Sequence, residues 1–191
     1  MPRAPTRGRI AVGAVAIAGL LALVLLAMGR EPWCTCGRIA LWHGVVDSAE
    51  NSQHLFDWYS FTHLAHGFGL YALVTRLAPG ASPGVRFLLA MAGEAAWEAI
   101  ENTPFVIERY RAVTLARGYY GDSVVNALGD LATAALGFAF AARAPAALTV
   151  AAFVALEVFL AWAIRDNLTL NVVMLVFPIE AIEAWQQGAG G

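Results

Sequence analysis

An uncharged run of twenty residues near the N-terminus constrains the fold of this chain more than any other feature. The run extends from Ile10 to Gly29, and as a helix it would be ~30 Å long, the thickness of the hydrocarbon core of a bilayer. It is longer than the apolar part of a secretory signal peptide, which has roughly 7–15 residues, and no small-x-small cleavage site ends it. We therefore interpret it as a retained membrane anchor that follows Arg3, Arg7 and Arg9.

The remainder of the chain has the composition of a membrane protein. Hydrophobic residues make up 59% of the 191 residues and charged residues only 14%, against roughly a quarter in soluble domains. Five further apolar segments follow the anchor, at about 58–75, 87–102, 120–142, 144–164 and 168–185. The sequence therefore predicts an all-α, polytopic transmembrane helical bundle with about six spans and membrane lipid as its surroundings. It argues against a nucleic-acid partner, because no basic face is present.

The predicted spans also define an expected organisation along the chain. In order, it is an inner tail at 1–9, an anchor at 10–29, an outer interfacial segment at 30–57, a five-span bundle at 58–185 and an inner tail at 186–191. Arginines precede the first span, and the loops expected on the inner side lack acids. This pattern predicts that the N-terminus lies inside.

Several ionisable side chains fall within the predicted spans, where each costs roughly 3 kcal/mol at the bilayer centre. Their spacing of three or four residues places them on shared helix faces. One face has His63 and His66, a second has Glu94, Glu98 and Glu101, and a third has Asp122, Asn126 and Asp130. Because successive spans cross the membrane in opposite directions, all of these residues fall in the half of the membrane next to the outer side. All but two of the 14 acids, Glu180 and Glu183, fall on that outer half. We therefore predict an outward-opening acidic site that attracts cations.

Imidazole and carboxylate groups are ligands for Zn²⁺, Fe²⁺ or Mn²⁺. The first-choice ligands for such a divalent metal are His63, His66, Glu98 and Asp130. Glu94 or Glu101 would serve as a catalytic base or as an extra ligand. The spacing matches no established metal signature such as H-E-x-x-H.

The same residues permit other interpretations. In a structural network, the carboxylates would pair with Arg109, Arg111 and Arg165. In a proton- or ion-coupled transporter they would form a relay, although no stripe of acids continues to the inner side. In an assembly factor, Arg109 and Arg111, together with Asp122 and Asn126, would contact an anionic head group or substrate.

The segment Cys34-Thr35-Cys36 is a separate feature. A disulfide between cysteines two residues apart is uncommon, whereas two neighbouring thiolates can hold a soft metal such as Cu(I). The alternative is a pair of interfacial thiols.

Five sequence blocks together resemble one protein family. They are CTCGRIALWHG (34–44), NSQHLFDWYSFTHLAHGF (51–68), GEAAWEAIENTPFVIERYR (93–111), GYYGDS (118–123) and IRDNLTLNVVML (164–175). They are similar to an uncharacterised family of bacterial, chiefly alphaproteobacterial, multi-pass inner-membrane proteins. The resemblance implies a multi-span helical fold in the bacterial inner membrane, and it implies no activity. The arginines before the first span would then place the N-terminus in the cytoplasm.

The leading hypothesis is therefore metal-dependent chemistry or binding on a lipid-linked or envelope substrate. The alternatives are a non-enzymatic membrane protein with a structural polar network or, third, a proton- or ion-coupled transporter. The residues alone do not decide whether the protein is an enzyme.

Overall fold

The computed structural model describes residues 5–115 and 117–188. Within these residues it contains eight α-helices and a single isolated bridge, between Trp42 and Phe56. The helices are α1 (Arg7–Ala27), α2 (Ser60–Leu77), α3 (Pro83–Glu101), α4 (Pro104–Val113), α5 (Val124–Ala141), α6 (Ala146–Ile164), α7 (Leu168–Val176) and α8 (Glu180–Gln186). The predicted all-α helical bundle is confirmed.

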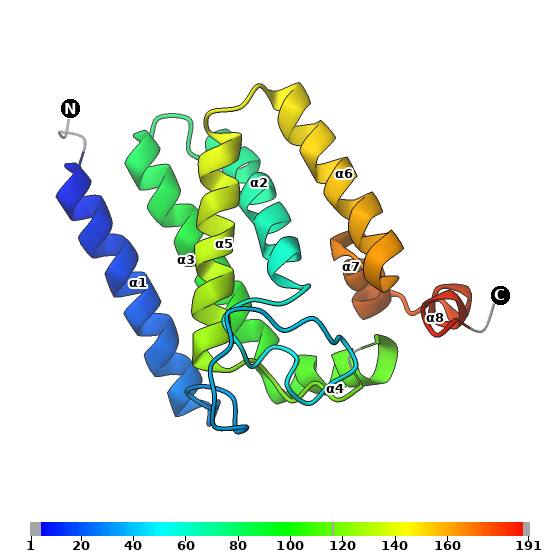
Figure 1. The fold of residues 1–191 in the computed structure, drawn as a ribbon. Coiled ribbons are helices and arrows are strands. Elements are labelled where there is room, and N and C mark those ends of the chain that lie inside the picture. Colours follow the sequence, from blue (N-terminus) through cyan, green and yellow to red (C-terminus); the bar gives the residue numbers. More distant parts are fainter. Residues whose placement is uncertain (1–4, 116, 189–191) are drawn as a thin grey trace.

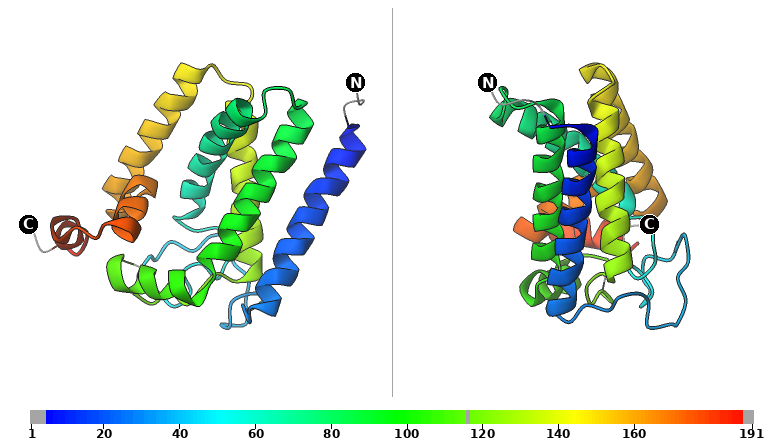
Figure 2. Two further views of the ribbon diagram at one scale, coloured as in Figure 1. Left: turned by 180° about the vertical axis from the view of Figure 1, so that it is seen from behind. Right: turned by 90° about the vertical axis from the view of Figure 1, so that its left-hand side faces the viewer.

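The long helices α1, α2, α3, α5 and α6 run alongside one another in alternating directions (Figure 1). Helix α4 lies crosswise at the end of the bundle where α1 and α3 finish, and the loop between α1 and α2 covers the same end (Figures 1 and 2). We call this the polar end of the bundle, because the buried polar residues Asp57, Asn102 and Asp122 lie there. The short turns 78–82 and 142–145 lie at the other end.

Three of the described helices, α1, α5 and α6, are long and apolar enough to cross a membrane. In α1 and α6, only 11% of the most apolar window is buried inside the protein, so most of their apolar side chains face outward. This is the pattern expected for helices in contact with lipid. Helices α2 and α3 have similar lengths but carry the buried histidines and glutamates of the site.

Glycines allow α2 and α5 to pack with their backbones in close contact. A methyl group on Gly67 of α2 would overlap the carbonyl oxygen of Ala134, and one on Gly137 of α5 would overlap that of Leu64. Small residues serve this purpose in membrane helix packing because no side chain separates the two helices. The close contact positions the α2 histidines over the polar face of α5.

The sixth predicted span is wrong as a continuous helix. Helix α7 has nine residues and ends at Val176, because Pro178 cannot donate a helical hydrogen bond and restricts the residue before it. At ~1.5 Å per residue it is less than half as long as a bilayer core is thick. At the end of α8, Gln186 Nε2 donates to Asp166 Oδ1 at 3.2 Å.

The end of the described chain therefore lies beside the end of α6, at the polar end of the bundle. The sequence had instead predicted that residues 186–191 form an inner tail, on the side opposite the turn that contains Asp166. Residues 1–4 of the other expected inner tail, with Arg3, and residues 189–191 lie outside the described residues.

Candidate metal centre

Two histidines of α2 converge on one carboxylate oxygen of α3. The Nδ1 atom of His63 lies 2.6 Å from Oε1 of Glu94, and the Nδ1 atom of His66 lies 3.0 Å from the same oxygen. Glu98, one helical turn further along α3, has its Oε1 atom 3.1 Å from His63 Nδ1. On the other side of the ring, His63 Nε2 lies 4.0 Å from Oδ2 of Asp130 on α5.

Burial makes this cluster electrostatically unusual. Glu94, Glu98 and Asp130 are each no more than 3% exposed. No hydrogen bond from the described residues reaches either carboxylate oxygen of Glu98 or the Oδ1 atom of Asp130. An ionised carboxylate in such a place is costly unless a cation or a proton neutralises it. The cluster therefore needs a positive partner beyond its two histidines.

The predicted alternative partners do not supply this charge. Arg109 donates from Nε to the carbonyl oxygen of Leu175 at 2.9 Å, and Arg111 is exposed on α4. Arg165 donates to the carbonyl oxygen of Trp185. Over residues 5–115 and 117–188, arginine ion pairs involve Glu50 and Glu183, neither of which belongs to the cluster. The structural network based on Arg109, Arg111 and Arg165 is therefore wrong.

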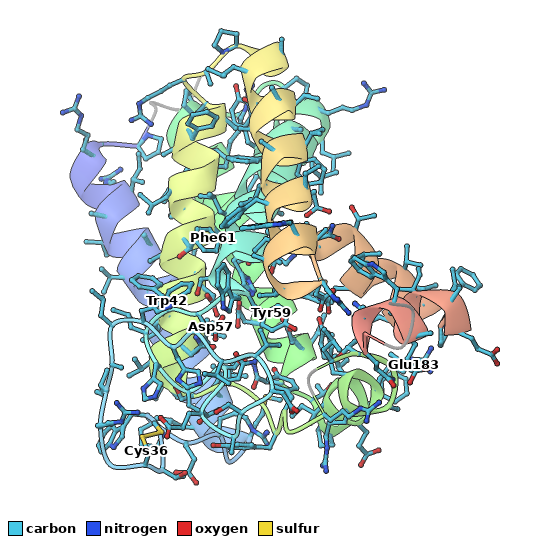
Figure 3. The ribbon with its side chains drawn as sticks, turned by 45° about the vertical axis from the view of Figure 1, so that its right-hand side comes forward. Cys36, Trp42, Asp57, Tyr59, Phe61 and Glu183 are labelled. Carbon is cyan, nitrogen blue, oxygen red and sulfur yellow. A yellow bond between two sulfur atoms is a disulfide. The ribbon has the colours of Figure 1, made fainter. Side chains whose placement is uncertain are left out.

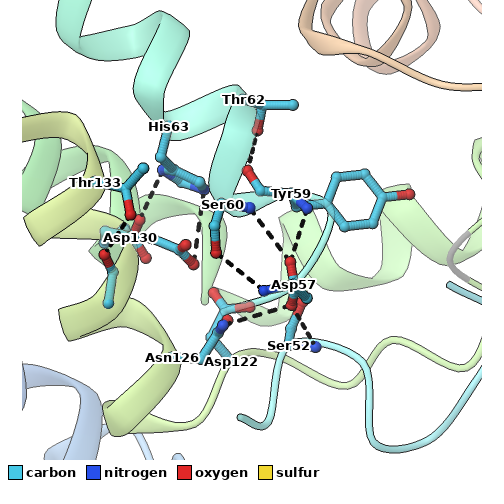
Figure 4. A network of polar contacts seen from close by, with 12 residues as sticks. Ser52, Asp57, Tyr59, Ser60, Thr62, His63, Asp122, Asn126, Asp130 and Thr133 are labelled. Atoms are coloured by element: carbon cyan, nitrogen blue, oxygen red, sulfur yellow. Dashed lines mark hydrogen bonds and ion pairs between the residues drawn. The ribbon is translucent and has the colours of Figure 1, made fainter. Parts of the chain in front are cut away.

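Two further acids beside the cluster, Asp57 and Asp122, accept hydrogen bonds from neighbouring groups. Asp122 accepts from Asn102 Nδ2 at 2.6 Å and from the hydroxyl of Tyr119 at 3.1 Å. Burial raises the pKa of Asp122 to about 6. Asp57, before α2, accepts from the backbone N–H of Ser52 at 3.0 Å (Figure 4). The Asp122 contacts join the end of α3 to the loop before α5, whereas the Asp57 contact lies within the loop before α2.

Asn126 has an equally structural role. Its Nδ2 atom donates to the carbonyl oxygen of His54 at 2.9 Å and lies 3.5 Å from Asp57 Oδ2. It is 1% exposed and holds the 30–57 segment against α5. The structure thus separates the four residues predicted to contact an anion, because Asn126 is enclosed, Asp122 lines a pocket and Arg109 and Arg111 lie on α4.

A pocket of about 330 Å³ adjoins the cluster. Its wall contains His63, His66 and Asp130 from the cluster, with Glu101 and Asp122. Four aromatic residues complete the polar side, and these are Tyr59, Trp97, Tyr110 and Tyr119. Helix α7 contributes an apolar side through Leu168, Val172 and Leu175. The pocket therefore combines acids and hydroxyls with an apolar strip.

The geometry can accommodate metal ligands in two overlapping groups. One ligand atom from each of His63, His66 and Glu94 lies within 4.8 Å of the others, and the same holds for His63, Glu98 and Glu101. Of the predicted ligands, His66 and Glu98 thus each share a group with His63, whereas Asp130 belongs to neither group and faces the Nε2 atom of His63. Glu94, predicted as a base or an extra ligand, is the carboxylate nearest to both imidazoles.

Two pocket tyrosines, Tyr59 and Tyr119, were not assigned a role from the sequence, whereas Tyr110 was expected to contact a phosphate together with Arg109 and Arg111. Tyr59, Tyr110 and Tyr119 line the pocket, and Tyr110 hydrogen-bonds Glu101. Tyr59 directly precedes α2, Tyr110 lies within α4 and Tyr119 lies in the loop before α5, so no common spacing in the sequence marks them. Glu157 of α6, although buried, points away from the cluster, and its two oxygens accept from the backbone N–H groups of Leu168 and Thr169.

Comparison with known proteins gives the chain a family. Residues 25–188 match the sequence model of a family described as "Protein of unknown function (DUF2585)". The chain belongs to the DUF2585 family. The resemblance found in the sequence blocks is thereby confirmed.

Relatives of this DUF2585 chain occur in several alphaproteobacteria. It is 50% identical to a "UPF0314 protein" of Novosphingobium aromaticivorans over 96% of this chain and 95% of the relative. It is 49% identical to a UPF0314 protein of Sphingopyxis alaskensis over 92% and 93%, and 50% identical to one of Paracoccus denitrificans over 87% and 86%. No solved structure matches the chain.

Proposed function

We propose that this DUF2585 protein is a multi-pass protein of the bacterial inner membrane that binds a divalent transition-metal cation. The ligands are His63, His66, Glu94 and Glu98, and Asp130 lies on the opposite edge of the His63 imidazole, 4.0 Å from its Nε2 atom. The convergence of two imidazole Nδ1 atoms on one oxygen of Glu94 carries this proposal. A cation at that point replaces the two Nδ1 protons and binds all three groups.

The charge of the region supports a cation. Six acids surround the two histidines, namely Asp57, Glu94, Glu98, Glu101, Asp122 and Asp130. Even with both histidines protonated, ionised acids would outnumber positive charges. A divalent ion offsets two carboxylates at once, and the mixture of imidazole and carboxylate ligands suits Zn²⁺, Fe²⁺ or Mn²⁺.

The adjacent pocket supports chemistry on a bound substrate. A divalent cation at the site supplies Lewis-acid polarisation of a substrate oxygen. Glu101 lines the same pocket and is positioned to accept a proton. The apolar strip from α7 favours a substrate with an apolar part, such as a lipid-linked or envelope molecule. With the N-terminus in the cytoplasm, the pocket lies at the outer side of the membrane.

Elemental analysis of detergent-purified protein tests the metal site. We expect near-stoichiometric metal in the wild-type protein and its loss in the double variant His63→Ala, Glu98→Gln. The variant Glu180→Gln is a matched control, because Glu180 is exposed on α8. A wild-type protein that remains metal-free after incubation with Zn²⁺, Fe²⁺ and Mn²⁺ would refute the proposal.

A proton- or ion-coupled transporter is the second candidate. Asp130, His63, Glu94 and His66 form a continuous chain of contacts over three helices, and chains of Asp, Glu and His side chains are what proton relays use. Proton-coupled flux in liposomes that Asp130→Asn abolishes would favour it. A metal-free protein without flux would instead favour a non-enzymatic role for the buried polar network.

A further inference from the structure

A groove of about 500 Å³ lies between α2, α3 and α6, beside the pocket of the candidate metal centre. It follows α2 from His66 to Ala72, a rise of ~9 Å along the helix, away from the polar end of the bundle. Its wall is mainly apolar, with Phe68 from α2 and Phe153 from α6, and a methyl group on Gly69 would meet nothing within 4 Å. Because α6 is apolar enough to cross a membrane, the groove opens at the level of the lipid chains.

The groove adjoins the pocket, because His66, Trp97 and Leu168 line both. The imidazole of His66 and the indole of Trp97 meet edge to face, with their ring centroids 6.1 Å apart. On the pocket side, Tyr59 lies beside the end of α6, where its hydroxyl donates to Asp166 (Figure 3). A ligand with its polar part in the pocket can therefore extend an apolar part along the groove.

The polar wall of the pocket presents hydrogen-bond acceptors to a ligand. The hydroxyl of Tyr59 donates to Asp166 at 3.1 Å. The hydroxyl of Tyr119 donates to Asp122, also at 3.1 Å, and Thr62 donates to a backbone carbonyl oxygen at 2.7 Å. With these protons used, each hydroxyl oxygen has only its lone pairs left to offer. No arginine is found among the described residues that line the pocket, and the chain contains no lysine.

Three further oxygens of the pocket residues are buried and receive no hydrogen bond from the described part of the chain. They are Oδ1 of Asn51, Oε2 of Glu101 and Oδ1 of Asp130. Each is an acceptor, and leaving a buried acceptor without a partner costs roughly 1–3 kcal/mol. A ligand that donates several hydrogen bonds removes this cost, whereas a phosphate adds acceptors and negative charge. The pocket therefore favours a head group rich in donors.

The loop before α2 holds the Asn51 side of the pocket in place. Cys34 and Cys36, which the sequence had left as thiols or as an uncommon disulfide, form a disulfide at the far end of this loop (Figure 3). Nearer the pocket, Gln53 donates from Nε2 to the carbonyl oxygen of Gly121 at 2.7 Å. A wall that is fixed before the ligand arrives lowers the entropic cost of binding.

We propose that the groove and the pocket together bind one membrane lipid with an uncharged, hydroxyl-rich head group. The hydrocarbon chain lies in the groove between α2, α3 and α6, and the head group enters the pocket sideways from the membrane, past His66 and Trp97. Its hydroxyl groups donate to the acceptors of the pocket wall. This inference rests on the proposed function, since the lipid is then the substrate that is presented to the cation at the histidines.

Native mass spectrometry of the full-length protein in a polyoxyethylene detergent tests this proposal. The probes are lipids with the same dioleoyl chains and a glucosyl, a phosphate or a trimethylammonium head group. We expect one equivalent of the glucosyl lipid to bind roughly 10-fold or more tightly than either charged lipid. Equal or tighter binding of a charged lipid, or no saturable binding of the glucosyl lipid, would overturn the proposal.

Two bulky substitutions test the route of the hydrocarbon chain. Gly69→Phe fills the groove and should weaken binding of the glucosyl lipid by roughly 10-fold or more. Ala152→Phe is the matched control, because Ala152 lines a separate groove between α2, α5 and α6 that shares no residue with the pocket. Equal affinities of the two variants for the glucosyl lipid would contradict the placement of the chain.

A third variant tests the head group. Asn51→Leu removes one unpaired acceptor from the pocket wall, so it should weaken binding of the glucosyl lipid and leave the weaker binding of the phosphate lipid unchanged. Equal losses for both lipids would contradict recognition by acceptors. The metal content of the same samples separates the two proposals. Lipid binding without metal refutes the metal site alone, and a metal-loaded protein that binds no glucosyl lipid refutes this inference alone.

Discussion

The Nδ1 atom of His63 lies 2.6 Å from Oε1 of Glu94, 31 residues further along the chain, and both side chains are buried. This contact joins α2 to α3 at the level where Asp130 of α5 faces the opposite edge of the imidazole. Three helices thus meet at one histidine. The arrangement makes Glu94 the central carboxylate of the proposed metal site.

Replacement of Glu94 by Gln should weaken metal binding by at least roughly 10–100-fold, because a neutral amide is a poorer ligand than a carboxylate. Competition against a chromophoric chelator measures this affinity in detergent-purified protein. Glu108→Gln is the matched control, since Glu108 is an exposed acid on α4. An affinity equal to that of the wild type would remove Glu94 from the site.

Replacement of Glu157 by Ala should destabilise the junction of α6 and α7. Its two oxygens accept from the N–H groups of Leu168 and Thr169 at 3.1 and 2.9 Å, at the positive end of the α7 dipole. We expect a loss of about 1–2 kcal/mol in the free energy of unfolding. Thermal unfolding followed by circular dichroism measures the loss, with Glu180→Ala as the control. Equal stability of the two variants would contradict the capping role.

Replacement of Gly137 by Ala should disrupt the packing of α2 against α5. The added methyl group would overlap the carbonyl oxygen of Leu64, which is backbone and cannot move aside. We expect destabilisation of about 1–3 kcal/mol or more. Gly69→Ala is the control on α2, because a methyl group there meets nothing within 4 Å. The thermal unfolding midpoints of the two variants should therefore differ, and equal midpoints would contradict the close packing.

Much of this architecture follows from the sequence. The first five predicted spans each overlap one observed long helix, with ends that differ by up to four residues, because apolar runs separated by Pro and Gly turns leave few alternatives. The spacing of His63 with His66, and of Glu94 with Glu98, predicts shared helix faces, and the alternation of helix direction brings these faces to the same depth. Helical periodicity and the alternating direction of successive helices therefore predict that the two histidines of α2 lie near Glu94 and Glu98 of α3.

The remaining features depend on contacts that no local pattern encodes. The run after Leu168 is apolar enough to suggest a span, yet Pro178 ends α7 and the chain turns back to Asp166. Asn102 and Asp122 pair across helix α4 and the loop that follows it, and Glu157 caps a helix that follows its own. Such loop contacts depend on the exact path of the backbone, so spacing alone cannot predict them.

Asp166 should make the stability of the protein depend on pH. Burial raises its pKa from 3.8 to about 6, so the folded state holds this proton more tightly than the unfolded state. The resulting stabilisation is complete below the unfolded pKa and is lost as the pH rises through about 6. The groups facing Asp166 are Tyr59, Glu157, Asn167, Asn171 and Gln186.

The variant Asp166→Asn isolates this contribution. The unfolding midpoint of the wild type should fall between pH 4 and pH 7 more steeply than that of the variant. The difference should correspond to no more than about 3 kcal/mol. Asp122, with a pKa also raised to about 6, acts in the same direction and leaves a residual slope in the variant. Identical pH profiles for the two proteins would contradict the assignment to Asp166.

The broken sixth span leads to a prediction about membrane topology. With five crossings, a cysteine at Gln187 is on the same side as one at Ser48, and a cysteine at Ser82 is on the opposite side. In a background with Cys34 and Cys36 replaced by Ser, a membrane-impermeant maleimide added to intact spheroplasts should label the Ser48 and Gln187 positions alike. If Ser48 is labelled while Gln187 and Ser82 are both protected until the membrane is permeabilised, the chain crosses six times. That result would contradict the placement of α8 beside Asp166, because their hydrogen bond requires both to lie at the same end of the bundle.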